Sequence, residues 1–356
     1  MFPRVSLIIL NWNGWKDTLE CLESVYRVNY PNYDVIVVDN GSQDDSVRRI
    51  KEYAQGKLRV SSKFFEYNPE NKPIKVFELT GEEARCGKFD RPLYEKYDPY
   101  RRLIMIRNAK NLGYTGGNNI GIKFALSVLN SEYVLLLNND TVVDPGFIEK
   151  LISLPERKGL SQRPKIVGPV IMYYDHPGRA QFVKAKYLMR PFFKKAFDSS
   201  VSVDYSEKPI LPTDEVHGAA MMLEKDVLLK VGLLDEEYFA YWEETDLSLR
   251  ARREGVGLYI VPQARVWHKM GSRDKKRRKI NPMAAYLFGR NMIYLIHKNF
   301  EGVDKFVSLL FDVLILIPYL MVSYTVYRRD TAAARMFALG VLSGIFKIDT
   351  KVRFGV

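Results

Sequence analysis

Three acidic stretches contain the residues whose types and spacing could do chemistry. In the first, Asp140 follows Asn138 and Asn139 directly after the apolar run 133–137, and in the second, Asp39 ends another apolar run. Continuous apolarity is typical of a strand covered on both faces, and ligands of an open α/β sheet bind beyond the carboxyl ends of its strands. A carboxylate at that position could hold a hard cation against phosphate oxygens. The alternative is a polar turn that simply ends the strand.

The third stretch places several carboxylates behind a group of aromatic side chains. Glu243, Glu244 and Asp246 follow Tyr238, Phe239, Tyr241 and Trp242 and begin a predicted helix that ends at Gly255. The helix dipole favours each carboxylate in a first turn by roughly 0.3 to 1 kcal/mol, so capping explains part of the pattern. Three acids against four aromatic residues exceed what capping needs. Apolar surroundings raise the pKa of a carboxylate, which suits a general base.

A histidine and a basic run follow the last predicted strand. His268, one of four histidines, ends the run 266–268, and residues 269–279 are strongly basic. A lone histidine in this position is usually just hydrogen-bonded, although histidine is also the commonest metal ligand. The basic run is typical of a solvated loop.

A glycine-rich segment, 111–121, precedes another predicted helix. It lacks the ending of a P-loop and the spacing of a dinucleotide-binding fingerprint. Gly113, Gly117 and Gly121 recur every four residues, which places them on one helix face and favours close packing of that helix on a sheet. The functional alternative leaves Asn111 and Asn118 facing a sugar nucleotide.

The elements that must position these residues alternate between strand and helix. Apolar runs at 5–10 and 34–38 predict strands, and amphipathic patterns at 17–28 and 44–53 predict helices. Such a pattern predicts a right-handed parallel βαβ unit, in which both strands end at one edge of the sheet. Asn11 and Asp39 are therefore expected to share a crevice.

The rest of the chain is predicted to contain one domain with two less regular regions and a tail. The α/β domain is expected over 1–270, with a mostly parallel sheet and helices on both faces. Residues 57–102 are interpreted as an insertion that contains a hairpin from runs 60–67 and 74–79. Residues 175–214 are interpreted as an irregular, basic and aromatic region on the acceptor side. Residues 271–356 would form a basic loop and apolar helices.

Composition limits the possible partners and location. The 356 residues carry a formal net charge of +12, which favours an anionic partner such as nucleic acid, a lipid surface or a phosphorylated substrate. Two cysteines without metal-site spacing fit a reducing cytosol, and no secretory signal is expected at the start of the sequence.

The C-terminal tail is apolar and flanked by basic residues. Residues 306–327 are about long enough to span a bilayer but include Asp312 and Pro318. On a helix, Ser308, Asp312, Tyr319 and Ser323 would form a polar stripe, which favours a helix that lies at an interface or packs on a partner. We therefore expect a cytoplasmic protein attached peripherally to anionic lipid on the inner face of the cell membrane; a single span is the alternative.

Seven motifs in order resemble the family 2 inverting glycosyltransferases of GT-A fold, particularly rhamnosyltransferase-like members that build cell-surface polysaccharides. The matching stretches are VSLIILNWNG at 5–14, VIVVDNGSQD at 35–44, NLGYTGGNNIG at 111–121, LLLNNDT at 135–141, HGAAMM at 217–222, FAYWEETDLSLRARREG at 239–255 and VWH at 266–268. They cover most of 5–268. The implied fold is a Rossmann-like α/β domain.

The resemblance implies a role for each matching residue. Asp39 would accept hydrogen bonds from the nucleotide base, Asp140 would bind a divalent metal together with His268, and Glu244 would be the catalytic carboxylate, with Glu243 and Asp246 beside it. Asn138 stands where the family's metal motif begins with Asp. The residues expected to face the donor are Asn11, Asn13, Asp39, Asn111, Gly113, Asn118, Asn138 and Asn139.

The implied reaction moves a sugar from a nucleotide-diphosphate donor to a hydroxyl of a glycan or polyprenyl-linked acceptor, assisted by Mg²⁺ or Mn²⁺. Neither the sugar nor the base follows from the sequence. A catalytically silent membrane-associated protein with the same fold is an alternative. A nucleic-acid-binding protein, suggested by the basic and aromatic residues 184–197, is a weaker one, because strand-end acids repel phosphate unless a metal intervenes. No nucleic-acid partner is therefore expected.

Overall fold

A computed structural model of the chain describes residues 2–153, 166–187, 194–197, 210–269 and 279–347. Eleven strands of these segments form one sheet. They are β1 (Val5–Asn11), β2 (Tyr33–Asp39), β3 (Lys75–Thr80), β4 (Arg102–Arg107), β5 (Tyr133–Asn138), β6 (Thr141–Val143), β7 (Ile166–Tyr173), β8 (Ala180–Phe182), β11 (Leu211–Pro212), β12 (Ala220–Glu224) and β13 (Leu258–His268). The main order is β11-β13-β7-β12-β5-β1-β2-β4-β3, with β6 on β13 and β8 on β7.

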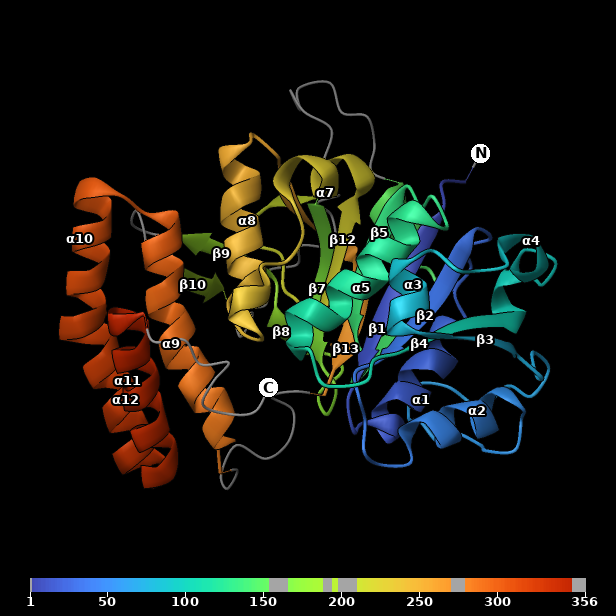
Figure 1. Ribbon diagram of the computed structural model, residues 1–356, viewed down its shortest axis with the longest axis horizontal. Helices are drawn as coiled ribbons and strands as arrows, with labels where there is room; N and C mark the ends of the chain where they lie inside the picture. The colour runs from blue at the N-terminus through green and yellow to red at the C-terminus, as the bar shows by residue number, and fades with distance from the viewer. Residues whose placement is uncertain (1, 154–165, 188–193, 198–209, 270–278, 348–356) are drawn as a thin grey trace.

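The helices lie on both sides of this sheet and at one end of the molecule (Figure 1). They are α1 (Trp15–Val25), α2 (Ser46–Ala54), α3 (Gly81–Arg85), α4 (Arg91–Tyr94), α5 (Gly113–Ser127), α6 (Phe147–Ile152), α7 (Lys225–Val231), α8 (Glu243–Arg253), α9 (Pro282–Asn299), α10 (Gly302–Phe311), α11 (Ile317–Val322) and α12 (Thr331–Phe346). The predicted α/β class, with a mostly parallel sheet and helices on both faces, is confirmed.

The first half of the sheet is parallel and fixes the strand ends relative to one another. β1 pairs with β2 on one side and with β5 on the other, and Asn11 lies opposite Asp39 in the register. Leu10 of β1 lies opposite Asn138 at the end of β5. The polar residues that follow these strands therefore meet at one edge, as the alternation of strand and helix predicted.

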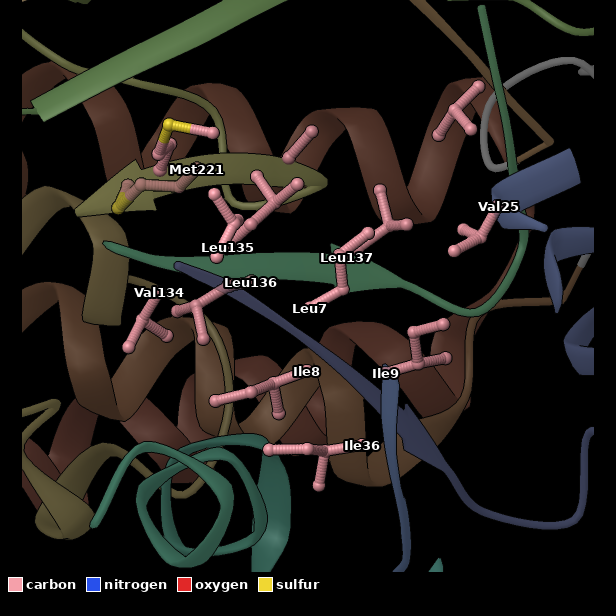
Figure 2. Packing of buried hydrophobic residues seen from close by; sticks show 14 of the residues in the cluster. Leu7, Ile8, Ile9, Val25, Ile36, Val134, Leu135, Leu136, Leu137 and Met221 are labelled. Carbon is pink, nitrogen blue, oxygen red and sulfur yellow. The ribbon is translucent and has the colours of Figure 1, made fainter. Parts of the chain in front are cut away.

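The centre of the core lies between β1 and β5, where the side chains alternate between the two faces of the sheet. Figure 2 shows Val134 and Leu136 on the same side as Ile8, and Leu135 and Leu137 on the opposite side. All of these side chains are at most 2% exposed. Their burial on both faces explains why the sequence of these strands is continuously apolar.

Glycines bring α5 against β1. A Cβ atom built at Gly117 would lie 2.4 Å from Leu10 Cδ1, and one at Gly121 would lie 2.7 Å from Ile8 Cγ2. Both distances are shorter than a real Cβ contact allows. The close-packing interpretation of the repeated glycines is therefore confirmed for these two positions.

The second half of the sheet mixes directions. β12 runs antiparallel to β5 and β7, whereas β13 runs parallel to β7. The run 266–268 is the end of a longer strand, because β13 is continuous with a bulge between Val261 and Arg265. The continuous strand delivers His268 to the same end of the sheet as β6, which pairs with it through Thr141.

The predicted hairpin within 57–102 is wrong. Residues 60–67 form no strand, and β3 pairs in parallel with β4 as an edge strand of the main sheet. The aromatic residues of the first run find partners elsewhere, since Phe64 packs on Trp267 at 4.8 Å between ring centroids and Arg27 stacks on Phe65. These contacts stabilise an irregular segment without a cross-strand partner.

The prediction of an irregular segment at 175–214 is wrong for its described parts. Besides β8 and β11, an antiparallel pair forms between β9 (Lys184–Tyr187) and β10 (Lys194–Phe197). Arg190 and residues 198–209 lie outside the described residues, as do 270–278 of the basic run.

The C-terminal helices form a second, smaller core. α9 and α12 pack together through Met292, Ile293 and Phe337, all fully buried. Figure 1 shows α9 between α8 and the helices α10–α12 at one end of the molecule. A continuous helical stretch, Gly302–Tyr327, has 26 residues; its most apolar 18-residue window has mean hydropathy 2.2, and only 11% of that window is buried. Within the predicted polar stripe, Ser308 and Asp312 are buried, whereas Tyr319 is 65% exposed.

Candidate active site

A cleft of about 1890 Å³ opens at the edge where β1, β2 and β5 end. Its lining includes Asp39 after β2, the segment 138–140 after β5, and residues 111–114 at the start of α5. Tyr241 and, from α9, Met283 and Leu287 close it from the other side. The cleft is therefore shared between the parallel half of the sheet and the C-terminal part of the chain.

Asn11 and Asp39 form a buried polar pair at the first strand ends. Asn11 Nδ2 donates to Asp39 Oδ1 at 2.8 Å and to Ser42 Oγ at 3.1 Å, and Thr18 Oγ1 donates to Asn11 Oδ1 at 2.8 Å. Asn13 Oδ1 accepts from the backbone N–H groups of Gln43 and Asp44 in the loop after β2. These bonds fix the loop and the orientation of the Asp39 carboxylate, which lines the cleft.

Asn40 directly follows β2 and was not singled out from the sequence. Its Nδ2 donates to Asn111 Oδ1 at 2.8 Å and to the Gly113 carbonyl at 2.9 Å, and its Oδ1 accepts from Leu112 N. Gly113 has φ +74°, and a Cβ atom there would lie 2.4 Å from the Phe239 carbonyl oxygen. Asn111 and Gly113 line the cleft. Their hydrogen bonds to Asn40 also join the start of α5 to the loop after β2.

Asn118 lies apart from the other residues expected to face the donor. It is 1% exposed, its Nδ2 donates to the Tyr114 carbonyl within α5, and it is absent from the cleft lining. The structure therefore places Asn118 in helix packing.

Asp140 and His268 come together at the ends of β5 and β13. His268 Nε2 lies 3.2 Å from Asp140 Oδ1, and His268 is 1% exposed. Burial acts to raise the pKa of Asp140, but the hydrogen bond and charge of His268 outweigh it and hold that pKa below its usual value. Asn138 and Asn139 line the cleft beside Asp140, and Asn139 Nδ2 donates to Thr18 Oγ1 at 3.0 Å.

The side chains of Asp140 and His268 suit a divalent cation that takes its other coordinating atoms from a bound ligand. Carboxylate, imidazole and amide oxygen are acceptable ligands of Mg²⁺ or Mn²⁺. Among the described residues, no three His, Cys, Asp or Glu side chains form a metal cluster. Asp140 and His268 could thus hold a cation whose remaining ligands come from a bound diphosphate and water.

Asp246 has different contacts from Glu243 and Glu244. Its carboxylate is fully buried and accepts from Arg250 Nε at 2.8 Å, Asn299 Nδ2 at 2.9 Å and Lys298 Nζ at 2.9 Å. These partners join α8 to the end of α9. All the acceptor capacity of Asp246 goes to this structural network, so it is poorly placed to act as a base.

Glu243 and Glu244 form a close acidic pair at the start of α8. Burial raises the pKa of Glu243 well above its usual value, and the nearby charge of Glu244 raises it further. Glu244 is half-buried, and a Cβ atom at Gly218 would lie 3.7 Å from it. A third buried carboxylate, Glu215, accepts from Thr245 Oγ1 at 2.7 Å. Like charges in a low-dielectric environment favour protonation of one member of the pair, and the raised pKa of Glu243 marks it as that member.

Tyr114 lies near both acidic regions. Its hydroxyl donates to the Gly218 carbonyl at 2.9 Å, beside Glu244. Burial raises the pKa of Tyr114, and the charges of Glu243, Glu244 and Asp140 add to the effect. Tyr114 also lines the cleft. It was missed as a site residue although it lies inside the motif at 111–121.

The loop before α8 has an unusual backbone. Phe239, Tyr241 and Trp242 have φ values of +61°, +72° and +73°. Non-glycine residues in such conformations cost about 1 to 3 kcal/mol each and persist where the surrounding structure holds them. Strained backbone of this kind clusters at functional sites. Here Tyr241 lines the cleft, whereas Glu243 and Glu244 follow the loop outside the cleft lining.

The fold resembles those of solved glycosyltransferases. The mannosyltransferase PcManGT from Pyrobaculum calidifontis, in complex with GDP-Man and Mn²⁺, superposes with a TM-score of 0.52 at 11% identity over 98% of this chain and 89% of that one. GalNAc-T7 with UDP, GalNAc and Mn²⁺ gives 0.54 at 15% identity over 83% and 48%. The mostly parallel sheet and the cleft at its carboxyl edge thus define a protein of GT-A fold.

Sequence comparison gives the family. Residues 6–72 match Glycosyl transferase family 2, and residues 83–282 match Glycosyltransferase like family 2. The chain belongs to glycosyltransferase family 2.

Relatives within this family have names that concern glycan assembly. The low-salt glycan biosynthesis hexosyltransferase Agl10 of Haloferax volcanii is 31% identical over 154 residues, which is 43% of this chain and 47% of that protein. The dTDP-rhamnosyl transferase RfbF of Shigella flexneri is 25% identical over 244 residues, 65% of this chain and 78% of that protein. The chain therefore spans about half of the first relative and most of the second.

Proposed function

We propose that this protein is an inverting, metal-assisted glycosyltransferase that moves a hexosyl or rhamnosyl group from a nucleotide-diphosphate sugar to a hydroxyl of a glycan or polyprenyl-linked acceptor. The observation that supports it best is that Tyr114 lines the cleft together with Asp140, while its hydroxyl donates to the Gly218 carbonyl beside Glu244. Family membership supports the same class of reaction.

The donor would bind along the strand ends. Asp39, oriented by Asn11 and Ser42, would accept hydrogen bonds from the base. Asp140 and His268 would hold a divalent cation, whose charge would neutralise the diphosphate leaving group. A leaving group stabilised in this way does not need the protonating carboxylic acid that glycoside hydrolysis requires.

The acceptor would be activated from the other side of the cleft. Glu244 would accept the proton of the acceptor hydroxyl as its oxygen attacks the anomeric carbon opposite the leaving group, and a single displacement inverts the configuration. Glu243, kept protonated by burial and by Glu244, would add no second negative charge. Asp246 would only hold α8 in place.

The C-terminal helices support an acceptor presented at a membrane surface. One face of 302–327 is apolar and exposed at Phe306, Leu310 and Leu314, and Lys305, Arg328 and Arg329 flank or follow it. Apolar burial with basic flanks suits a cytoplasmic surface of anionic lipid. Because α9 lines the cleft and leads into this helix, attachment would bring the cleft close to a lipid-linked acceptor. Catalytic domain 1–270 and tail 271–356 would therefore act together.

A donor panel tests the proposal. Purified protein should release nucleoside diphosphate from one of dTDP-rhamnose, UDP-hexoses or GDP-mannose with Mn²⁺ or Mg²⁺ and a membrane extract as acceptor, and EDTA should abolish turnover. Asp140→Ala should lower kcat/KM by about a hundredfold or more, while Asp226→Ala on the exposed start of α7 should not. Absence of binding and turnover across the whole panel would refute the proposal in favour of a silent protein of this fold.

A vesicle experiment tests the location. The protein should float with vesicles that contain phosphatidylserine and dissociate at high salt or from neutral vesicles, because screening removes the electrostatic part of the attraction. Retention that only detergent reverses would favour a spanning helix instead.

A further inference from the structure

The 238–242 loop is held from a helix that lies about fifty residues further along the chain. Asn291 of α9 is fully buried, and its Nδ2 donates to the carbonyl oxygens of Tyr238 at 2.8 Å, Ala240 at 2.8 Å and Tyr241 at 3.0 Å. Arg290 donates to Asn291 Oδ1 at 2.9 Å, which orients the amide with its nitrogen toward the loop. One side chain therefore binds three carbonyls of the segment with positive φ values.

The same loop has other contacts. Ala240 N donates to the Tyr238 carbonyl at 2.7 Å, and Thr115 N of α5 donates to the Phe239 carbonyl at 3.1 Å. The Tyr238 hydroxyl lies 3.4 Å from Asp246 Oδ1, and Trp242 packs on Phe288 of α9 at 5.2 Å between ring centroids. Strained carbonyls without partners would relax toward ordinary backbone conformations. Asn291 binds three carbonyls of this loop at once, including that of Tyr241, one of the three residues with positive φ.

Helix packing does not explain this residue. α9 packs on α12 through apolar side chains and through Gly289 and Gly340, and an apolar residue at position 291 would meet the needs of that packing. A buried amide is retained at a cost unless its hydrogen bonds are made, and here those bonds go to the loop.

We propose that Asn291 is a positioning residue for the transfer reaction: it fixes the 238–242 loop so that Tyr241 faces the cleft and the Glu243 and Glu244 pair is presented at the start of α8. This inference rests on the proposed function, because it assigns Asn291 to the base side of that site. It also makes α9 part of the active site, although α9 carries no group that touches the reacting atoms.

Kinetics of Asn291→Leu test the role. Leucine has a similar volume and preserves burial but donates no hydrogen bond. We expect kcat to fall by about a hundredfold, since small misplacement of a reacting group has effects of this size. The donor KM, and the affinity for dTDP, UDP or GDP with Mn²⁺ measured by calorimetry, should change by less than about threefold, because Asp39 and Asp140 stay in place. Asn291→Gln, which keeps the donors, should retain more of kcat than the leucine variant.

Hydrogen exchange provides a readout that does not depend on turnover. Amides of 239–244 should exchange at least about tenfold faster in Asn291→Leu than in the unmodified protein, while those of β1 and β5 stay unchanged. Val341→Ala, which removes buried volume between α12 and α9 without contacting the loop, is the control matched for general loss of stability.

The outcomes separate this inference from the proposed function. Unchanged exchange in the loop, or a fall in kcat no larger than that of Val341→Ala, would overturn the role of Asn291. If the unmodified protein turns over no donor, the proposed function fails. Faster hydrogen exchange of the loop in the leucine variant would still show that Asn291 holds the 238–242 loop.

Discussion

The two sides of the cleft are built in different ways. On the donor side, Asn11 and Asp39 are neighbours because β1 and β2 are adjacent parallel strands of one βαβ unit. On the base side, Glu243 and Glu244 follow a strained loop that α5 and α9 hold from outside. The donor side thus follows from local chain topology, whereas the base side depends on a contact between distant segments.

Because of this difference, substitutions on the two sides should change different measured properties. A change on the donor side should act on ligand binding and leave the fold largely intact, because the strands beneath it are buried on both faces. A change on the base side can act through chemistry, through stability or through the loop. Four substitutions separate these possibilities, and they are ordered here by expected effect.

The largest effect is expected at Glu244. Glu244→Gln keeps the shape of the side chain but removes its basicity, so kcat should fall by about a thousandfold or more, within the range for loss of a general base. The donor KM should change little. Glu254→Gln, at the far end of α8, is the matched control and should stay within about twofold. Equal activity of Glu244→Gln and the unmodified protein would remove Glu244 as the base.

Asp246 should show the opposite behaviour two residues further along. Asp246→Ala removes the partner of Arg250, Lys298 and Asn299 and should lower the free energy of unfolding by roughly 3 kcal/mol, because it leaves cations partly buried and unpaired. Urea denaturation measures this loss. Asp226→Ala, at an exposed first-turn acid of α7, should cost less than about 0.5 kcal/mol. A fully stable but inactive Asp246→Ala would instead indicate a chemical role for Asp246.

Glu243 should make stability depend on pH. Its pKa is raised by burial and by Glu244, with Glu215 nearby, so the folded state keeps a proton that the unfolded state releases at an ordinary Glu pKa. Its contribution is favourable below the unfolded pKa and is lost as pH rises toward the folded pKa. Compared with the unmodified protein, Glu243→Gln should therefore become relatively more stable as pH rises from 5 to 8. Parallel stability curves for both proteins in urea titrations would contradict this interpretation of the pair.

The smallest effect is expected at Asn118. Asn118→Ala removes a hydrogen bond to the Tyr114 carbonyl and should cost about 1 kcal/mol of stability while leaving the donor KM within about twofold. Asn11→Ala, which disturbs the Asp39 carboxylate, should raise the donor KM by about tenfold. If both variants weaken donor binding equally, Asn118 would have to contact the donor, as the sequence predicted. Its hydrogen bond within α5 would then not be its main role.

Much of the donor side could be predicted from the sequence because its causes are local. Continuous apolar runs identified β1, β2 and β5, and the glycine spacing identified the face of α5 that packs on β1. The hairpin expected from runs 60–67 and 74–79 failed because Phe65 packs on Arg27 and Phe64 on Trp267 of β13 instead of on a paired strand. Pattern alone cannot tell which distant surface an aromatic side chain will bury.

The sequence by itself determined the fold class, the family and the order of the acidic residues along the chain, because strand periodicity and short motifs are written in neighbouring positions. Only the tertiary structure showed which partners each acid has. Asp246 is bound by α9, Glu243 is buried against Glu244, and Asn291 holds their loop. Contacts between segments some fifty residues apart depend on how the whole chain packs, and no local pattern records them.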